Sequence, residues 1–202
     1  MRLILASASP RRAELLRAAG FEFEIVPTDV DESVRGGESP SQYVRRLAAE
    51  KSAHVASGIS RTLDGPPEGG YYDRVILGAD TTVVVDGAIL GKPIDDREAA
   101  AMLARLSGRV HEVLTGISLR QGAYELGRVE TTRVEFARLS GADIAWYVDS
   151  GEGRDKAGAY AIQGLASRFI PRISGSYSNV VGLPVAAVFE LLTEISGTPR
   201  GR

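Results

Sequence analysis

The chain has 202 residues and a formal net charge of −2, with 44% apolar and 25% charged residues. These proportions are ordinary for a globular protein and argue against a fully disordered chain, while the near-neutral charge argues against a binder of nucleic-acid polymers. The absence of cysteine excludes disulfides, thiolate metal sites and a cysteine nucleophile.

No segment predicts targeting or a membrane span. The N-terminal apolar run becomes polar at Ser7, which is too early for a signal peptide. No apolar stretch approaches the ~20 residues that a membrane-spanning helix needs. We therefore expect a cytoplasmic protein without a membrane partner.

Strands and helices alternate in the first part of the chain. The expected elements are a strand over 3–6, a helix over 10–19, a strand over 21–26, a loop over 28–38 and a helix over 39–58. Ser9 and Pro10 are typical of an N-cap and a first helical turn. The alternation of apolar and acidic residues over 21–26 is strand periodicity. Gln42 stands three residues after Ser39, at the capping-box position of the second helix.

The same alternation continues in the second part of the chain. The expected elements are a loop over 64–72, a strand over 75–77, a hairpin over 82–90, a helix over 95–106, strands over 110–119 and 127–139, a helix over 140–148, short apolar runs over 157–162 and 169–173, and a helix over 183–195. Asp86-Gly87 is a strong hairpin signal, and Asp95 and Glu98 have capping-box spacing. The tail over 197–202 is expected to be flexible.

This order of elements predicts an α/β protein. The Thr- and Val-rich central strands favour some antiparallel pairing. The expected architecture is a mixed, twisted sheet with flanking helices. Two lobes around a cleft would be a natural arrangement, which the periodicity of the sequence does not settle.

The first candidate for chemistry is the segment Ser7-Ala8-Ser9-Pro10-Arg11-Arg12. Small residues between a strand and a helix let backbone N–H groups approach an anion, and two arginines add fixed positive charge. The segment could therefore cradle a phosphate, although no Gly-Lys-Ser/Thr follows as in a Walker loop. The alternative is a capped helix with solvated arginines.

The second candidate is Asp80, in the segment Gly78-Ala79-Asp80-Thr81. A carboxylate directly after a buried strand is where α/β folds often place site residues. Asp80 could bind a divalent cation or act as a general base. The alternative is a turn aspartate that hydrogen-bonds its own backbone.

Three separated charges form a third set. Lys51 lies on the predicted helix among apolar neighbours, where it could instead be a lysine whose ammonium extends to solvent. Lys92 follows a glycine and precedes a proline, in a constrained loop from which it could point at a ligand. Glu32 belongs to an acidic run of the kind that is usually a solvated loop.

Two further residues carry weaker signals. Gln163 lies in the Gly-containing segment 155–164 and could read a base edge, although a surface hairpin explains the glycines equally well. His111 is one of only two histidines, which excludes a His-rich zinc site, and we predict a structural role for it. The chain has no Gly-x-Ser-x-Gly elbow at a strand–helix junction and no Gly-x-Gly-x-x-Gly fingerprint after its first strand.

Taken together and in order, these segments resemble the Maf family of nucleoside triphosphate pyrophosphatases. The segments that carry the resemblance are 5–12, 78–81, 91–93, 106–108 before His111, 155–164 and 181–184. The resemblance spans nearly the whole chain. It implies a single domain over 1–202 with a fold related to inosine triphosphate pyrophosphatases, in which two lobes lie around a cleft. It also implies a homodimer and hydrolysis of a nucleoside triphosphate to the monophosphate and pyrophosphate.

The resemblance also implies roles for individual residues. Asp80 matches the proton acceptor, and Glu32 and Asp80 match acidic positions around a divalent metal cation, Mg²⁺ or Mn²⁺. Because an aspartate is a weak base near neutral pH, metal assistance is expected. The positions that match phosphate-binding residues are Ser7, Ser9, Arg12, Lys51 and Lys92. The positions that match the dTTP/UTP branch of the family are Arg11, Thr81 and Gln163.

The expected substrates are dTTP and UTP, with modified pyrimidine nucleotides as further candidates. Two other functions stay open. One is a nucleotide-binding regulator of septum formation and cell division with little turnover. The other is a phosphatase, which would release inorganic phosphate instead of pyrophosphate.

Overall fold

The structure is a computed structural model that describes residues 2–62 and 74–197. The predicted loop over 64–72 and all but the first residue of the predicted flexible tail lie outside the described residues. No helix in the described part of the chain is long and apolar enough to cross a membrane.

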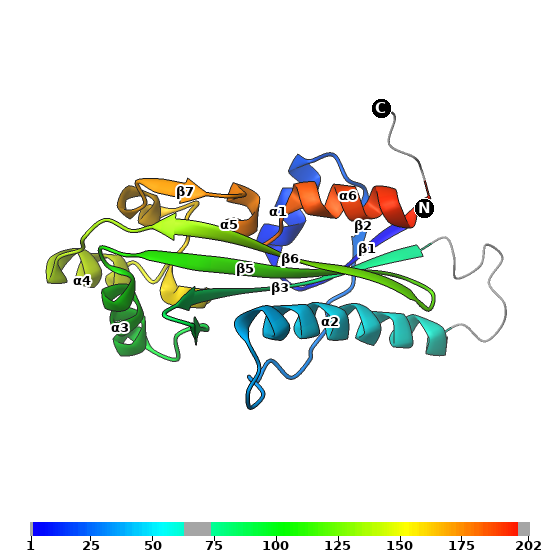
Figure 1. Ribbon diagram of the computed structural model, residues 1–202, viewed down its shortest axis with the longest axis horizontal. Helices are drawn as coiled ribbons and strands as arrows, with labels where there is room; N and C mark the ends of the chain where they lie inside the picture. The colour runs from blue at the N-terminus through cyan, green and yellow to red at the C-terminus, as the bar shows by residue number, and fades with distance from the viewer. Residues whose placement is uncertain (1, 63–73, 198–202) are drawn as a thin grey trace. The chain divides into compact units, whose positions relative to one another are not determined.

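Seven strands and six α-helices make up most of the described residues (Figure 1). The strands are β1 (Arg2–Ala6), β2 (Phe23–Ile25), β3 (Arg74–Val85), β4 (Ala88–Leu90), β5 (Val110–Gln121), β6 (Tyr124–Glu135) and β7 (Arg172–Ser174). The helices are α1 (Pro10–Ala18), α2 (Pro40–Thr62), α3 (Asp96–Leu106), α4 (Gly141–Asp149), α5 (Tyr177–Val181) and α6 (Val185–Ile195). Two 3₁₀ turns are η2 (Ala157–Ala159) and η3 (Leu165–Phe169).

The strands form one mixed sheet in the order β2-β1-β3-β5-β6-β7, with β4 paired to β3. β1 is parallel to both β2 and β3, whereas β4 is antiparallel to β3 and β7 is antiparallel to β6. The predicted mixed sheet with flanking helices is therefore confirmed.

The chain divides into two compact units. The first unit contains 1–80, 115–130 and 182–202, and the second contains 81–114 and 131–181. The long strands β3, β5 and β6 each contribute residues to both units. Each unit is described below by itself.

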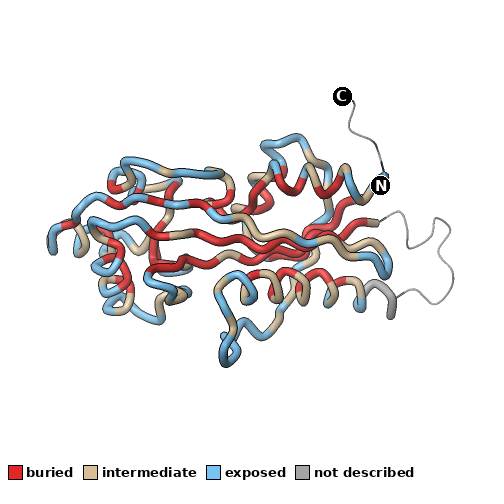
Figure 2. Tube along the Cα trace, in the orientation of Figure 1, coloured by how far each residue is buried: buried red, intermediate tan, exposed pale blue. Residues whose placement is uncertain are grey.

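In the first unit, the side chains of β1 alternate between two apolar clusters. Leu3 and Leu5 pack in a cluster with residues of α1 and α6, while Ile4 and Ala6 pack with Val55 of α2. A strand that is covered on both faces has no polar face, which is why residues 3–6 are continuously apolar. Figure 2 shows the resulting burial along the central strands.

Two glycines bring the backbone of α2 directly onto the sheet of the first unit. A Cβ atom at Gly78 would lie 2.2 Å from the backbone oxygen of Ala48. A Cβ atom at Gly116 would lie 2.2 Å from the backbone oxygen of Val44. Because any side chain would overlap the helix, these positions fix how closely α2 approaches β3 and β5.

In the second unit, three rings form a buried cluster. His111, Phe136 and Tyr160 pack edge to face, with ring centroids 4.9 to 5.4 Å apart. His111 Nε2 lies 2.8 Å from the Tyr160 hydroxyl. Burial lowers the pKa of His111 to about 4. His111 is thus part of the core, which agrees with the structural role predicted for it from the sequence.

The helix starts of the second unit are set by local side chains. Asp95 caps α3 by accepting a hydrogen bond from the Glu98 N–H at 2.7 Å. The Glu98 carboxylate accepts from the N–H of Ile94, one residue earlier than a standard capping box requires. Ser140 and Asp143 form a complete capping box at the start of α4.

The sequence prediction is wrong about β3. It placed a strand end at Gly78-Ala79-Asp80 and a separate strand after it, but a single strand runs from Arg74 to Val85. The missing side chain of Gly78 accommodates α2 and does not mark a turn. Asp80 therefore lies inside a buried strand, and the interpretation of Asp80 as a turn aspartate is also wrong.

Other boundaries shift by a few residues. β6 spans Tyr124–Glu135, earlier than the predicted 127–139, and β2 is shorter than predicted. α2 continues past Gly58 to Thr62. These differences lie at element ends and do not move the candidate site.

Candidate functional site

Charged side chains gather inside the first unit. Arg12, Lys51 and Asp80 are 8%, 6% and 7% exposed, respectively. Charged groups are seldom buried this deeply unless they are paired, because removal of an ion from water is costly. Their presence among apolar neighbours marks this region as the candidate site.

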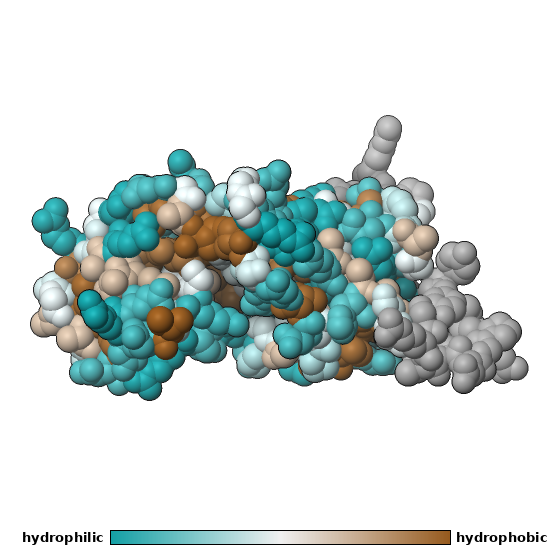
Figure 3. Space-filling model, turned by 90° about the horizontal axis from the view of Figure 1, so that it is seen from below, coloured by the Kyte–Doolittle hydropathy of each residue, from teal (hydrophilic) through white to brown (hydrophobic). Residues whose placement is uncertain are grey.

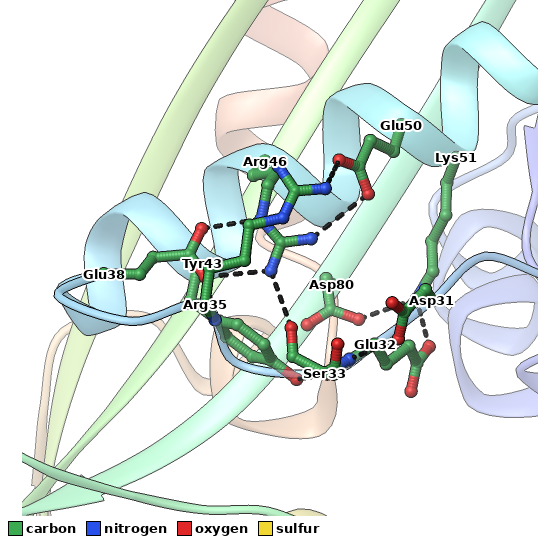
Figure 4. Close-up of polar contacts among 10 residues, drawn as sticks. All are labelled: Asp31, Glu32, Ser33, Arg35, Glu38, Tyr43, Arg46, Glu50, Lys51 and Asp80. Atoms are coloured by element: carbon green, nitrogen blue, oxygen red, sulfur yellow. Dashed lines mark hydrogen bonds and ion pairs between the residues drawn. The ribbon is translucent and has the colours of Figure 1, made fainter.

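Lys51 links two carboxylates. It extends from α2, and its Nζ donates to Oδ1 of Asp80 and to Oε1 of Glu32, both at 2.7 Å (Figure 4). The Lys51 side chain is 8% exposed, so its ammonium does not extend to solvent as the sequence alternative required. α2, β3 and the segment before α2 thus converge on one ammonium group.

Asp80 is a carboxylate in an unfavourable environment. Burial raises its pKa, and the positive charges of Lys51 and Arg12 oppose that rise without cancelling it. A carboxylate whose pKa is raised accepts a proton more readily than a solvated one. The position in a buried strand therefore makes Asp80 a better proton acceptor than its residue type alone suggests.

Arg12 is fixed by the loop between β1 and α1 and by Gly182, which lies between α5 and α6. Its Nη1 donates to Oγ of Ser7 at 3.0 Å, and its Nε donates to the backbone oxygen of Gly182 at 2.9 Å. Burial lowers the pKa of Arg12, and the negative charges of Asp80 and Glu32 oppose this effect. The alternative of a solvated arginine is therefore wrong for Arg12.

The predicted N-cap occupies its expected position but uses different contacts. Ser9 precedes α1, and Pro10 is its first residue, yet the Ser9 side chain makes no capping hydrogen bond. The Ser9 N–H instead donates to Oγ of Ser7 at 3.3 Å. Arg11 follows in the first turn of α1, where it is half-buried.

The predicted residues fall in both units. Ser7, Ser9, Arg11, Arg12, Glu32, Lys51 and Asp80 belong to the first unit, and Thr81, Lys92 and Gln163 belong to the second. Within the second unit, Lys92 is exposed between β4 and α3, and Gln163 is exposed between η2 and η3. The N–H of Gly158 donates to the backbone oxygen of Gly91 at 3.0 Å, which joins the segments that carry Lys92 and Gln163.

Sequence reasoning missed Tyr43 and Arg46. Both extend from α2 to the segment that contains Glu32, where the Tyr43 hydroxyl donates to the Glu32 backbone oxygen at 2.9 Å and Arg46 Nη2 donates to that of Ser33 at 3.0 Å. Their spacing of three residues places them on one side of the helix. The spacing predicts that the two side chains share one face of the helix. No sequence pattern indicates that this face contacts residues 31–38.

The carboxylates of Glu32 and Asp80 are suitable but incomplete ligands for a divalent cation. Within residues 2–62 and 74–197, no group of three or more His, Cys, Asp or Glu side chains is placed to hold a metal ion. Mg²⁺ is commonly held by one or two carboxylates together with water and substrate phosphates. Because both carboxylates are already bonded to Lys51, a cation held by them would take its remaining ligands from substrate and water.

Known proteins resemble this chain over nearly its whole length. The sequence model of a family described as Maf-like protein matches residues 2–195. A protein of Hahella chejuensis named dTTP/UTP pyrophosphatase is 52% identical over 195 residues, which cover 96% of this chain and 92% of the relative. A protein of Symbiobacterium thermophilum with the same name is 50% identical over 192 residues, covering 95% and 93%. Among solved structures, the Staphylococcus aureus Ham1 protein aligns with 96% of this chain and 99% of its own, at 13% identity and a TM-score of 0.49.

Proposed function

The chain belongs to the Maf family, and we propose that it is a nucleoside triphosphate pyrophosphatase that hydrolyses dTTP and UTP. The products are the nucleoside monophosphate and pyrophosphate. Modified pyrimidine nucleotides are further candidate substrates. The observation that carries the proposal is the charged cluster in which the buried Lys51 joins the buried Asp80 and the exposed Glu32 at 2.7 Å each, with Arg12 also buried.

The charges of the cluster suit a polyphosphate. A nucleoside triphosphate is strongly anionic, and cleavage at its α-phosphorus transfers further negative charge to the leaving pyrophosphate. Arg12 and Lys51 are held in place by hydrogen bonds before any substrate arrives. Fixed cations stabilise developing negative charge without having to reorganise, which is why such an arrangement favours phosphoryl transfer.

Asp80 is proposed to accept the proton of the attacking water. Lys51 bonds Oδ1 of Asp80, so Oδ2 is the oxygen to which the water donates. The water oxygen forms a bond to the α-phosphorus while the bond from that phosphorus to the bridging oxygen breaks, and pyrophosphate leaves. Burial raises the pKa of Asp80, which supports this role because a more basic carboxylate accepts a proton more readily.

A divalent cation, Mg²⁺ or Mn²⁺, is part of the proposal. Glu32 and Asp80 would hold it, and when bound it would supply positive charge that lowers the pKa of water and neutralises phosphate oxygens. The Glu32 side chain is 47% exposed, so a cation from solvent could reach its carboxylate while Lys51 holds it at 2.7 Å.

The remaining predicted residues keep the roles that the resemblance implies. Ser7, Ser9, Arg12, Lys51 and Lys92 are proposed to bind phosphate oxygens. The residues proposed to select the pyrimidine are Arg11, Thr81 and Gln163. The Gln163 side chain is exposed, and its amide can pair with both the O4 acceptor and the N3–H donor of uracil or thymine. A site that must satisfy both groups disfavours a base with the opposite pattern.

The proposal includes the assembly and location of the protein. The chain would form one Maf-like domain and act as a cytoplasmic homodimer. Sedimentation of the purified protein at several concentrations tests the dimer, and a single monomeric species at all of them would contradict it.

A nucleotide panel with product identification tests the activity. The protein is incubated with dTTP, UTP, dCTP and 7-methyl-GTP in Mg²⁺, with and without EDTA, and the released pyrophosphate and inorganic phosphate are measured separately. We expect pyrophosphate from dTTP and UTP in preference to the other nucleotides, and loss of turnover in EDTA.

Three results would contradict the proposal in different ways. Inorganic phosphate as the direct product would indicate a phosphatase. Nucleotide binding without release of either product would favour the regulator of septum formation. Preferential cleavage of 7-methyl-GTP would overturn the assignment of Arg11, Thr81 and Gln163 to pyrimidine selection.

A further inference from the structure

The segment 31–38 carries Glu32 and has no buried residue of its own to anchor it. It lies below the N-terminal end of α2 in Figure 1 and contains no helix or strand. Residues 31–37 are all exposed. The face of the molecule seen from below carries many hydrophilic side chains, with hydrophobic patches among them (Figure 3). Burial of apolar side chains therefore does not fix the segment, although Glu32 meets Lys51 at 2.7 Å.

Side chains of α2 restrain the segment: Glu50 accepts from Arg35 at 2.8 Å, and two others act at Glu32 and the residue after it. The Tyr43 hydroxyl donates to the backbone oxygen of Glu32 at 2.9 Å, and Arg46 Nη2 donates to the backbone oxygen of the next residue, Ser33, at 3.0 Å. Lys51 approaches Glu32 from the same helix, at the carboxylate end. The residue is thus held at its backbone and at its side chain by one rigid element (Figure 4).

Arg46 is itself held by acidic partners. Its Nε and Nη2 donate to the two oxygens of Glu38 at 2.6 and 2.8 Å, and its Nη1 donates to Glu50 at 3.2 Å. The hydrogen bonds from Arg46 lower the pKa of Glu38 to about 2. This arrangement uses three nitrogens of a planar guanidinium, which the single ammonium of a lysine cannot reproduce.

We propose that Tyr43 and Arg46 are positioning residues that set the Glu32 carboxylate for catalysis. The inference rests on the proposed function, because it gives Glu32 its role. Neither residue needs to touch the substrate. Each holds a backbone carbonyl of the segment. The Glu32 carboxylate is therefore already in place when the substrate binds, and no conformational entropy has to be lost at each turnover to order it.

The test is a set of variants in the full-length protein. Tyr43→Phe removes only the hydroxyl, and its matched control is Tyr124→Phe on β6. Arg46→Lys replaces the planar guanidinium with an ammonium, and its matched control is Arg45→Lys on the same helix. We expect Tyr43→Phe to lower kcat/KM for dTTP by about three- to tenfold, since it deletes one hydrogen bond. Arg46→Lys should lower kcat/KM for dTTP by about tenfold or more, and the controls should keep kcat/KM within about twofold of the wild-type value.

A double-mutant cycle separates positioning from general damage. If both residues act through Glu32, their substitutions should cost little in a Glu32→Gln background, because the group that they position is already lost. The proposal is overturned if the substitutions lower kcat/KM as much in the Glu32→Gln background as in the wild-type protein. Wild-type activity in both single variants would also overturn it. Tyr43→Phe keeps the ring and its packing, so it decides the matter if Arg46→Lys does not fold.

Amide hydrogen exchange gives a readout that is independent of turnover. We expect residues 31–38 to exchange about tenfold faster in Tyr43→Phe and Arg46→Lys, with α6 unchanged. Unchanged exchange over 31–38 would overturn the proposal. If the wild-type protein releases no pyrophosphate from dTTP, the proposed function fails, and the exchange result still decides whether these two side chains hold the segment.

Discussion

Replacement of His111 by Gln should reduce the loss of stability on acidification. Burial lowers the pKa of His111 from 6.5 to about 4, because the imidazole packs between Phe136 and Tyr160. Between these pH values His111 is protonated in the unfolded chain but neutral in the native state. The free energy of unfolding therefore decreases as the pH falls. Linkage gives a loss of about 2 kcal/mol by pH 5 and about 3 kcal/mol by pH 4.

Urea denaturation between about pH 7.5 and about pH 5 measures this loss. His111→Gln keeps a hydrogen-bonding group for Tyr160 but does not titrate, and His54→Gln on the exposed side of α2 is the control. Carboxylates titrate alike in all three proteins, so the difference between wild type and His111→Gln isolates the buried imidazole. The reasoning is refuted if both proteins lose the same free energy of unfolding over this range, or if His54→Gln has the larger effect.

Three further predictions concern the first unit and one control position. Asp80→Asn should lower pyrophosphate release from dTTP by about 10³-fold while unfolding stays cooperative; near-normal turnover would remove Asp80 from the mechanism. Lys51→Met should lower the free energy of unfolding in urea at neutral pH by about 3 kcal/mol, because it leaves the Asp80 carboxylate buried without its cation; an unchanged midpoint would contradict the ion pair. Gly78→Ala should cost about 3 kcal/mol in thermal or urea denaturation, because its Cβ would overlap the oxygen of Ala48. Gly141→Ala, which meets nothing within 4 Å, should change stability by less than about 0.5 kcal/mol, and equal effects at the two glycines would contradict the close contact.

Features set by neighbouring residues were predictable from the sequence. The capping box of Ser140 and Asp143, the hairpin at Asp86-Gly87 and the buried strand over 3–6 each depend on groups a few residues apart. Their geometry follows from local backbone preferences and periodicity, so the fold class and most elements could be predicted.

Features set by distant residues were not predictable from local patterns. Gly78 resembled the end of a strand because the helix that requires it, at Ala48, lies elsewhere in the sequence. Lys51 was compatible with a solvent-directed lysine because its partners are 19 and 29 residues away. The resemblance to a family supplied the residues of the site, but it gave no indication of Tyr43 or Arg46.

The contacts of α2 with Gly78 and Gly116 constrain how this site can evolve. The helix that presents Lys51 cannot move closer to the sheet, because its main chain already touches the sheet at two points. A laboratory selection for turnover of an altered nucleotide should therefore recover few substitutions that act by moving this helix closer to the sheet. Adaptive changes should accumulate instead in the segment 31–38, where exposed residues can be exchanged without disturbing the sheet.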